Sequence, residues 1–168
     1  MIFLGLLVKS RIFVMPSDLR IRIKVDARAA IARMNAMERR SKDFRPVFRW
    51  AKRELEKANA ANFAQNGLPV GGWSPLKPRY SAWKATKFPG APIMVASGKL
   101  FKELRSLNGP ANSIRLKSAT FGTDLEYAKF HQYGTSKMPK RKIIYEPKQF
   151  AERLAILAAD YVSDGRTR

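Results

Sequence analysis

Apolar and basic residues alternate strictly over residues 19–25, near the start of the chain. Successive side chains of a β-strand point to opposite faces, so this period of two predicts a half-buried strand. The residues expected on its inner face are Leu19, Ile21, Ile23 and Val25.

The spacing of apolar residues changes to that of an α-helix after residue 25. Asp26 is a candidate N-cap, because its side chain can accept a hydrogen bond from a free N–H group of the first helical turn. Ile31, Met34 and either Met37 or Glu38 lie at helical spacing and predict an inward face for a helix that ends near residue 41. Pro46 suits the first turn of a second helix, which continues to about residue 65. The apolar stripe expected on that second helix consists of Val47, Phe48, Ala51, Leu55, Ala58 and either Asn62 or Phe63.

Residues 66–94 form a different kind of segment, which is rich in glycine, proline and aromatic residues. This composition predicts an irregular excursion that contains one short helix over residues 79–86. Ser97 is then a candidate cap for a helix over residues 98–107. The residues expected to point inward from that helix are Leu100, Phe101 and Leu104.

The last third of the chain mixes short apolar runs with turn residues. We expect a pair of antiparallel strands over residues 113–117 and 119–122, a short helical turn over 125–133 and a strand over 142–145. Pro147 opens a final helix. The apolar face of that helix carries Phe150, Leu154, Leu157, Ala158 and Tyr161. The predicted fold class is α+β, with a small antiparallel sheet packed against long N-terminal helices and a C-terminal helix, and an irregular Trp- and Pro-rich excursion.

The length of 168 residues fits one domain. We expect residues 1–18 to be an N-terminal arm or upstream extension, 19–162 to be the single domain and 163–168 to be a tail. Residues 1–8 are apolar, but their basic neighbours follow them instead of preceding them, which is unlike a secretory signal. The run is also too short to cross a bilayer, so we predict no membrane association. Met15 is a plausible alternative start.

Charge is strongly unbalanced, with 33 Lys and Arg against 13 Asp and Glu. Such an excess attracts polyanions, which include nucleic acids and acidic protein surfaces. Residues 61–123 contain nine basic residues and one acid, Glu103. The stronger candidates for contact with DNA or an acidic partner lie later in the chain, and they are Lys137, Lys140, Arg141 and Lys142. Earlier candidates are Lys77, Arg79, Lys84 and Lys87. Charge alone leaves open that these side chains only form a solvated surface.

Aromatic residues alternate with the earlier basic residues, and they are Trp73, Tyr80, Trp83 and Phe88. In a single-strand binder such rings stack on bases. The alternative is that they anchor the irregular excursion to the body, since each ring can bury on the order of 150–250 Å². We favour anchoring.

The residues that carry chemistry form no catalytic pattern. The chain has no cysteine and one histidine, so neither a thiolate site nor a multi-histidine metal site can be built. His131 is interpreted as a structural, hydrogen-bonded side chain in an aromatic turn. Ser97 lacks the glycines of a nucleophile elbow, and Asp124 and Glu126 would point apart on a helix. Phosphate-binding glycine motifs are also lacking. We therefore expect no enzyme activity, no cofactor and no metal.

A series of short motifs runs from residue 62 to residue 141. Its members in order are Trp73, Pro75, Leu76, Tyr80, Trp83, Ser97, Gly98, Leu100, Tyr127, His131, Gln132 and Gly134, followed by the basic group at 137–142. In this order and at these gaps the chain resembles the phage virion morphogenesis (tail completion) family. The resemblance covers residues 19–158.

The resemblance implies a structural phage virion protein of the neck or upper tail. Such a protein completes or terminates the tail and joins it to the head as part of an oligomeric ring. The implied partners are copies of itself, with a hexamer favoured, and neighbouring neck and tail proteins. Contact with packaged DNA, without sequence specificity, is left open. Assembly in the host cytoplasm and residence in the virion follow from the same resemblance. The alternative is a basic nucleic-acid-binding protein without enzymatic activity, which would neither self-associate nor stay in purified particles.

Overall fold

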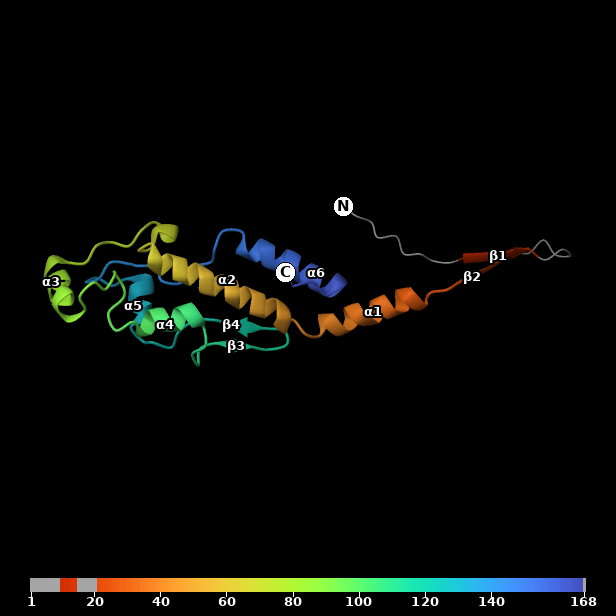
Figure 1. Cartoon of the computed structure of the whole chain (residues 1–168), viewed down its shortest axis with the longest axis horizontal. Helices are drawn as coiled ribbons and strands as arrows, with labels where there is room; N and C mark the ends of the chain where they lie inside the picture. The colour runs from red at the N-terminus through yellow and green to blue at the C-terminus, as the bar shows by residue number, and fades with distance from the viewer. Residues whose placement is uncertain (1–9, 15–20, 168) are drawn as a thin grey trace.

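The computed structural model describes residues 10–14 and 21–167 (Figure 1). The first described element is a β-hairpin in which β1 (Ser10–Val14) pairs antiparallel with β2 (Ile21–Val25), and Ile12 lies opposite Ile23. The predicted strand at 19–25 is thus confirmed as β2 over residues 21–25, while residues 19 and 20 lie outside the described residues. Its partner β1 lies within residues that we expected to be an arm, and the predicted division into arm, domain and tail stays a prediction.

Two helices follow the hairpin along the long axis of the molecule (Figure 1). They are α1 (Arg28–Ser41) and α2 (Arg45–Ala64). A short 3-10 turn η1 (Leu68–Val70) and helix α3 (Pro78–Lys87) come next, in the excursion. The remaining elements are α4 (Lys99–Ser106), β3 (Ser113–Ile114), β4 (Ala119–Thr120), α5 (Ala128–Tyr133) and α6 (Phe150–Asp164).

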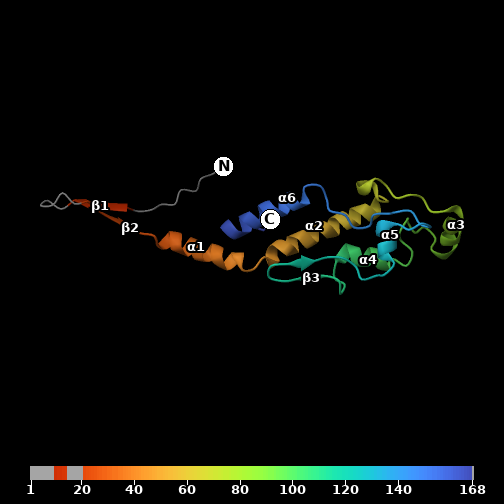
Figure 2. The same ribbon diagram turned by 180° about the vertical axis from the view of Figure 1, so that it is seen from behind.

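Helix α2 is the central element of the body. Helix α6 runs along one side of α2, and α4 with the β3–β4 hairpin lies along the other side (Figures 1 and 2). Two aromatic contacts attach α6: the Phe150 ring stacks on Trp50 at 6.1 Å, and Tyr161 meets Phe44 edge-on at 6.3 Å. The far end of α2 is surrounded by α3, α4 and α5 (Figure 2).

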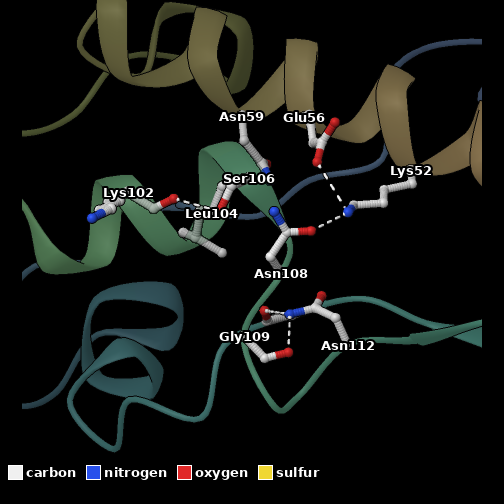
Figure 3. Close-up of polar contacts among 10 residues, drawn as sticks. Lys52, Glu56, Asn59, Lys102, Leu104, Ser106, Asn108, Gly109 and Asn112 are labelled. Atoms are coloured by element: carbon white, nitrogen blue, oxygen red, sulfur yellow. Dashed lines mark hydrogen bonds and ion pairs between the residues drawn. The ribbon is translucent and has the colours of Figure 1, made fainter.

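The core lies between α2, α4 and the segments that follow α5. Its buried residues are Phe63, Trp73, Leu100, Leu104, Ala128 and Ile143. Leu104 is completely buried, and its carbonyl oxygen accepts a hydrogen bond of 2.9 Å from Nδ2 of Asn59 on α2 (Figure 3). Carbonyl groups in the last turn of a helix lack a partner within the helix, so Asn59 supplies one from outside.

A second polar connection joins the same two helices (Figure 3). Lys52 on α2 donates a hydrogen bond to Oδ1 of Asn108, just beyond the end of α4, and its Nζ lies 3.5 Å from Glu56. Asn112 then holds the next turn by donating 3.1 Å hydrogen bonds to the carbonyl oxygens of Gly109 and Gly122. These contacts fix the direction in which the chain leaves α4.

The predicted long N-terminal helices, C-terminal helix and antiparallel pairing are confirmed, but the α+β class is wrong because the described chain is mostly helical. It has six α-helices and two separate two-stranded sheets, so the sheet does not form a layer. The expected strand over residues 142–145 is wrong. The N–H groups of Ile143 and Ile144 donate instead to Oε1 of Gln132, at 2.9 and 3.0 Å. A side chain therefore occupies the donors that a neighbouring strand would need.

Two predicted caps are displaced by one residue. Ala27 and not Asp26 is at the N-cap of α1, although Oδ1 of Asp26 still accepts a 3.2 Å hydrogen bond from the Arg28 N–H. Gly98 and not Ser97 is at the N-cap of α4, where its φ of 79° suits glycine. The Ser97 Oγ lies 3.5 Å from the Lys99 nitrogen, at the long limit of a hydrogen bond.

The inward face predicted for α1 is also wrong. Ile31 is 54% exposed and Met34 is 67% exposed, and α1 has no buried residue. The helical spacing was correct, but no other helix of the described chain covers this part of α1.

Candidate functional site: a basic-rimmed groove

A groove with a volume of about 530 Å³ lies at the end of the molecule where α3, α4 and α5 gather. Four separate segments line it: residues 76–84 with α3, residues 94–100 with the start of α4, residues 127–131 at α5, and residues 137–141. The motif residues that reach it are Leu76, Tyr80, Ser97, Gly98, Leu100, Tyr127, His131, Lys137 and Arg141. Residues that are more than 60 positions apart in the sequence therefore share one site.

Trp73 holds the base of this end together, although it lies outside the groove. Its ring is buried and meets the Phe63 ring edge-on at 5.2 Å. Its Nε1 donates a 2.9 Å hydrogen bond to the carbonyl oxygen of Lys142. Gly67 lies against the ring with a φ of 81°, and a Cβ added there would come within 2.3 Å of Trp73. Trp73 thus joins the end of α2 to the late basic segment.

Arg141 corrects the prediction that the whole basic cluster is surface. It is only 5% exposed, and its Nε and Nη2 donate hydrogen bonds of 2.9 Å to the carbonyl oxygens of Ser74 and Pro75. Its own N–H donates to the His131 carbonyl oxygen at 2.8 Å. Arg141 is therefore a tie between the excursion and the end of α5, and its guanidinium forms one wall of the groove.

Lys84 is buried in the same way, at 5% exposure, and this corrects its prediction as a surface contact. Its Nζ donates a 3.1 Å hydrogen bond to the Ala91 carbonyl oxygen and another to that of Pro92. Burial lowers the pKa of Lys84, because the charged ammonium loses solvation. Lys84 and Arg141 thus place two cations in the groove wall that only carbonyl oxygens balance among the described residues.

The Gln132 side chain joins α5 to the backbone of residues 143–144 behind the groove. Its Nε2 donates a 2.8 Å hydrogen bond to the Ile144 carbonyl oxygen, while its Oε1 accepts from the two isoleucine N–H groups described above. This places Ile143 in the core and sets the path of residues 137–141. Gly134 allows the turn before them, since its φ is 78° and an added Cβ would lie 2.9 Å from the Lys140 nitrogen.

His131 lines the groove between these features. Its ring meets the Tyr127 ring edge-on at 6.2 Å. The expected side-chain hydrogen bond is not found at Nδ1, which is buried and has no partner in the described part of the chain. Burial, and then the positive charge of Arg141, lower the pKa of His131, so the ring is neutral at pH 7.

The remaining lining is apolar inside and basic at the edge. Met94, Val95, Met138 and Pro139 complete the apolar lining, while the exposed residues Lys77, Lys99 and Lys137 stand at the rim. None of the described residues that line the groove is an aspartate or a glutamate. Ser97 and His131 therefore lack a lining carboxylate that would orient the imidazole as a base. This arrangement can bind an anionic group with apolar parts, and it shows no catalytic set.

A family model matches residues 25–157, which include the whole groove and all of α1 to α5. Its description is the phage virion morphogenesis family. The chain belongs to the phage virion morphogenesis family. Comparison with curated proteins and with solved structures found no significant match. The resemblance expected from the motif series is confirmed at the level of the family.

Several predicted residues of this virion family member lie outside the groove. Tyr80 reaches the groove, but Trp83 does not, and their rings pack on each other at 5.3 Å. Trp83 is 48% exposed and contacts Phe88 at 6.0 Å, so it does not anchor the excursion by burial in the body. Lys140 and Lys142 are exposed beside the groove, and Pro75 is exposed above Arg141.

The predicted site residues did not include Met94, Val95, Lys99, Met138 and Pro139, which also line the groove. The available signal was their position next to Ser97 and Lys137, but their spacing follows no helix or strand period. Met94 adopts a φ of 66°, which is unusual for a residue other than glycine.

No helix in the described residues is long and apolar enough to cross a membrane. Among those residues, no group of three or more His, Cys, Asp or Glu side chains could hold a metal ion.

Proposed function

We propose that the protein is a structural component of the phage particle at the neck or upper tail. It completes or terminates the tail and joins it to the head as part of an oligomeric ring, for which six copies are the favoured number. The observation that carries the proposal is the match of the virion morphogenesis family to residues 25–157. A non-enzymatic role agrees with this family and with a groove that offers a binding surface.

The elongated shape supports the same role. The hairpin and α1 extend from one end of α2, while the groove lies at the opposite end (Figure 1). A subunit with separate features at its two ends can contact two neighbours at once, as a ring subunit must. The exposed cations beside the groove, Lys137, Lys140 and Lys142, are suited to an acidic neighbour or to packaged DNA.

The test is to follow the protein into phage particles made in the host. Mass spectrometry of purified particles should detect it at a constant ratio to the other tail proteins. Deletion of its gene should leave full heads and unjoined tails, which electron microscopy distinguishes from whole particles. Particles that form normally and lack the protein would overturn the proposal.

The second candidate is a free nucleic-acid-binding protein, which the formal net charge of +20 favours. Such a protein would bind DNA in the infected cell and be absent from particles. The same fractionation therefore separates the two functions.

A further inference from the structure

The groove formed by α3, residues 94–98, α4, α5 and residues 137–141 has the shape of a binding site and no assigned occupant. We propose that it binds an extended acidic peptide segment, with apolar side chains, from a different protein of the particle. This inference rests on the proposed function and names the class of partner that the subunit holds.

The volume and lining of the groove favour a peptide. About 530 Å³ falls within the range of roughly 300–1,000 Å³ that is typical of ligand sites. The lining includes the aliphatic side chains of Leu76, Val95 and Leu100. Met94 and Met138 add unbranched, polarisable side chains, which adapt to varied apolar partners. Apolar side chains of a bound segment would fill this space.

The charge of the groove favours an acidic segment. Lys77, Lys99 and Lys137 are exposed at the rim, and no described lining residue is acidic. Behind them, the side-chain N–H groups of Lys84 and Arg141 donate to carbonyl oxygens of the described chain. Interactions between charges strengthen away from water, so a carboxylate placed here gains more than it would on an open surface.

The same charge argues against this protein's own N-terminal segment as the occupant. Residues 1–14 are mostly apolar, and both of their charged side chains, Lys9 and Arg11, are basic. These carry the same sign as the rim, so a second copy of the chain would bring repulsion into the groove.

The kinds of side chain that line the groove argue against single-stranded nucleic acid as its occupant. Proteins that bind single strands stack bases on exposed aromatic rings. Among the described lining residues, the rings are those of Tyr80, Tyr127 and His131; Tyr80 packs on Trp83, and Tyr127 meets His131 edge-on. The lining is otherwise aliphatic and basic, which matches apolar and acidic side chains.

The experiment measures binding of labelled probes to the full-length protein by fluorescence anisotropy. The main probe is a short peptide in which leucine and glutamate alternate. Matched peptides replace either glutamate by glutamine or leucine by glycine, and an oligothymidylate of similar charge tests nucleic acid. We expect the leucine–glutamate peptide to bind at least tenfold more tightly than either matched peptide.

Point variants locate the site. Lys99→Glu and Lys137→Glu reverse exposed rim charges, and each should weaken binding at least tenfold. Lys102→Glu is the matched control, because Lys102 is exposed on the same helix as Lys99 but lies outside the groove. It should change affinity less than threefold, and circular dichroism should show that all three variants are folded.

Three outcomes would overturn the inference: equal weakening by all three variants, no preference for the leucine–glutamate peptide, or tighter groove-dependent binding of the oligothymidylate. Each of these leaves the proposed function intact if the protein is found in particles. Conversely, a protein absent from particles that still binds the acidic peptide through Lys99 and Lys137 would overturn only the proposed function.

Discussion

Helices α1 and α2 follow one another in the chain, yet they have opposite surroundings. Six residues of α2 are buried, among them Val47 and Phe63, whereas α1 buries none. Both helices have apolar residues at helical spacing, so local pattern does not explain the difference. Helix α2 lies between α4 and α6, while the contacts of α1 with other helices of the described chain are chiefly with α6.

Two polar contacts join α1 to the C-terminal end of α6. Arg40 donates a hydrogen bond to the Val162 carbonyl oxygen, and Arg33 lies 3.3 Å from Asp164. Exposed ion pairs of this kind contribute roughly 0–1 kcal/mol. The comparison teaches that α2 is held by burial within the chain, whereas α1 remains a helix with an uncovered apolar side.

The largest effect is expected where α2 ends against Trp73. Trp73→Ala should lower the free energy of unfolding by about 3–5 kcal/mol, because it removes a buried ring and leaves a cavity. Urea unfolding followed by circular dichroism measures the change. Trp83→Ala is the matched control from the same excursion, and its half-exposed ring should cost less than about 1.5 kcal/mol. Equal losses in the two variants would contradict the burial of Trp73 as the anchor.

An intermediate effect is expected at Arg141, whose hydrogen bonds connect the excursion to the end of α5. Arg141→Ala removes two charged hydrogen bonds to carbonyl oxygens and should cost about 1–3 kcal/mol. Lys140→Ala changes the exposed neighbour and should stay within about 0.5 kcal/mol in the same unfolding assay. If the two variants unfolded alike, Arg141 would belong to the solvated basic surface after all.

The smallest effect is expected on α1. Met34→Ala should change the stability of the isolated subunit by less than about 0.5 kcal/mol, because the side chain is two-thirds exposed. Leu104→Ala, in the helix that packs on α2, removes a fully buried leucine and should cost about 2–5 kcal/mol. Thermal unfolding of both variants at low protein concentration gives the comparison. A large loss from Met34→Ala would show that α1 is packed within the subunit.

Most helices could be predicted from local sequence, because their signals lie within each segment. Pro46 in the first turn marks the start of α2, and the excursion helix predicted over 79–86 is observed as α3, Pro78–Lys87. The final helix predicted after Pro147 is observed as α6, in which Leu157 is buried as expected. Periodicity and proline positions act over a few residues, so distant parts of the chain do not alter them.

The errors share a different cause. The segment over 142–145 has the composition of a strand, but the Gln132 side chain takes its N–H groups. Arg141 and Lys84 are residue types that usually lie on the surface, but here they donate hydrogen bonds to carbonyl oxygens of other segments. In each case the deciding partner is a polar atom whose position depends on a turn elsewhere in the chain.

The sequence by itself determined the helices, the antiparallel pair β3–β4, the excess of positive charge and the membership in a virion protein family. Each of these depends on local spacing, on total composition or on the order of motifs. Only the tertiary structure decided that nine scattered motif residues meet in one groove, that two cations lie in its wall and that α1 is left uncovered. The physical reason is that burial depends on which segments pack together, and that packing is set by Trp73, Arg141 and Gln132 acting across many residues.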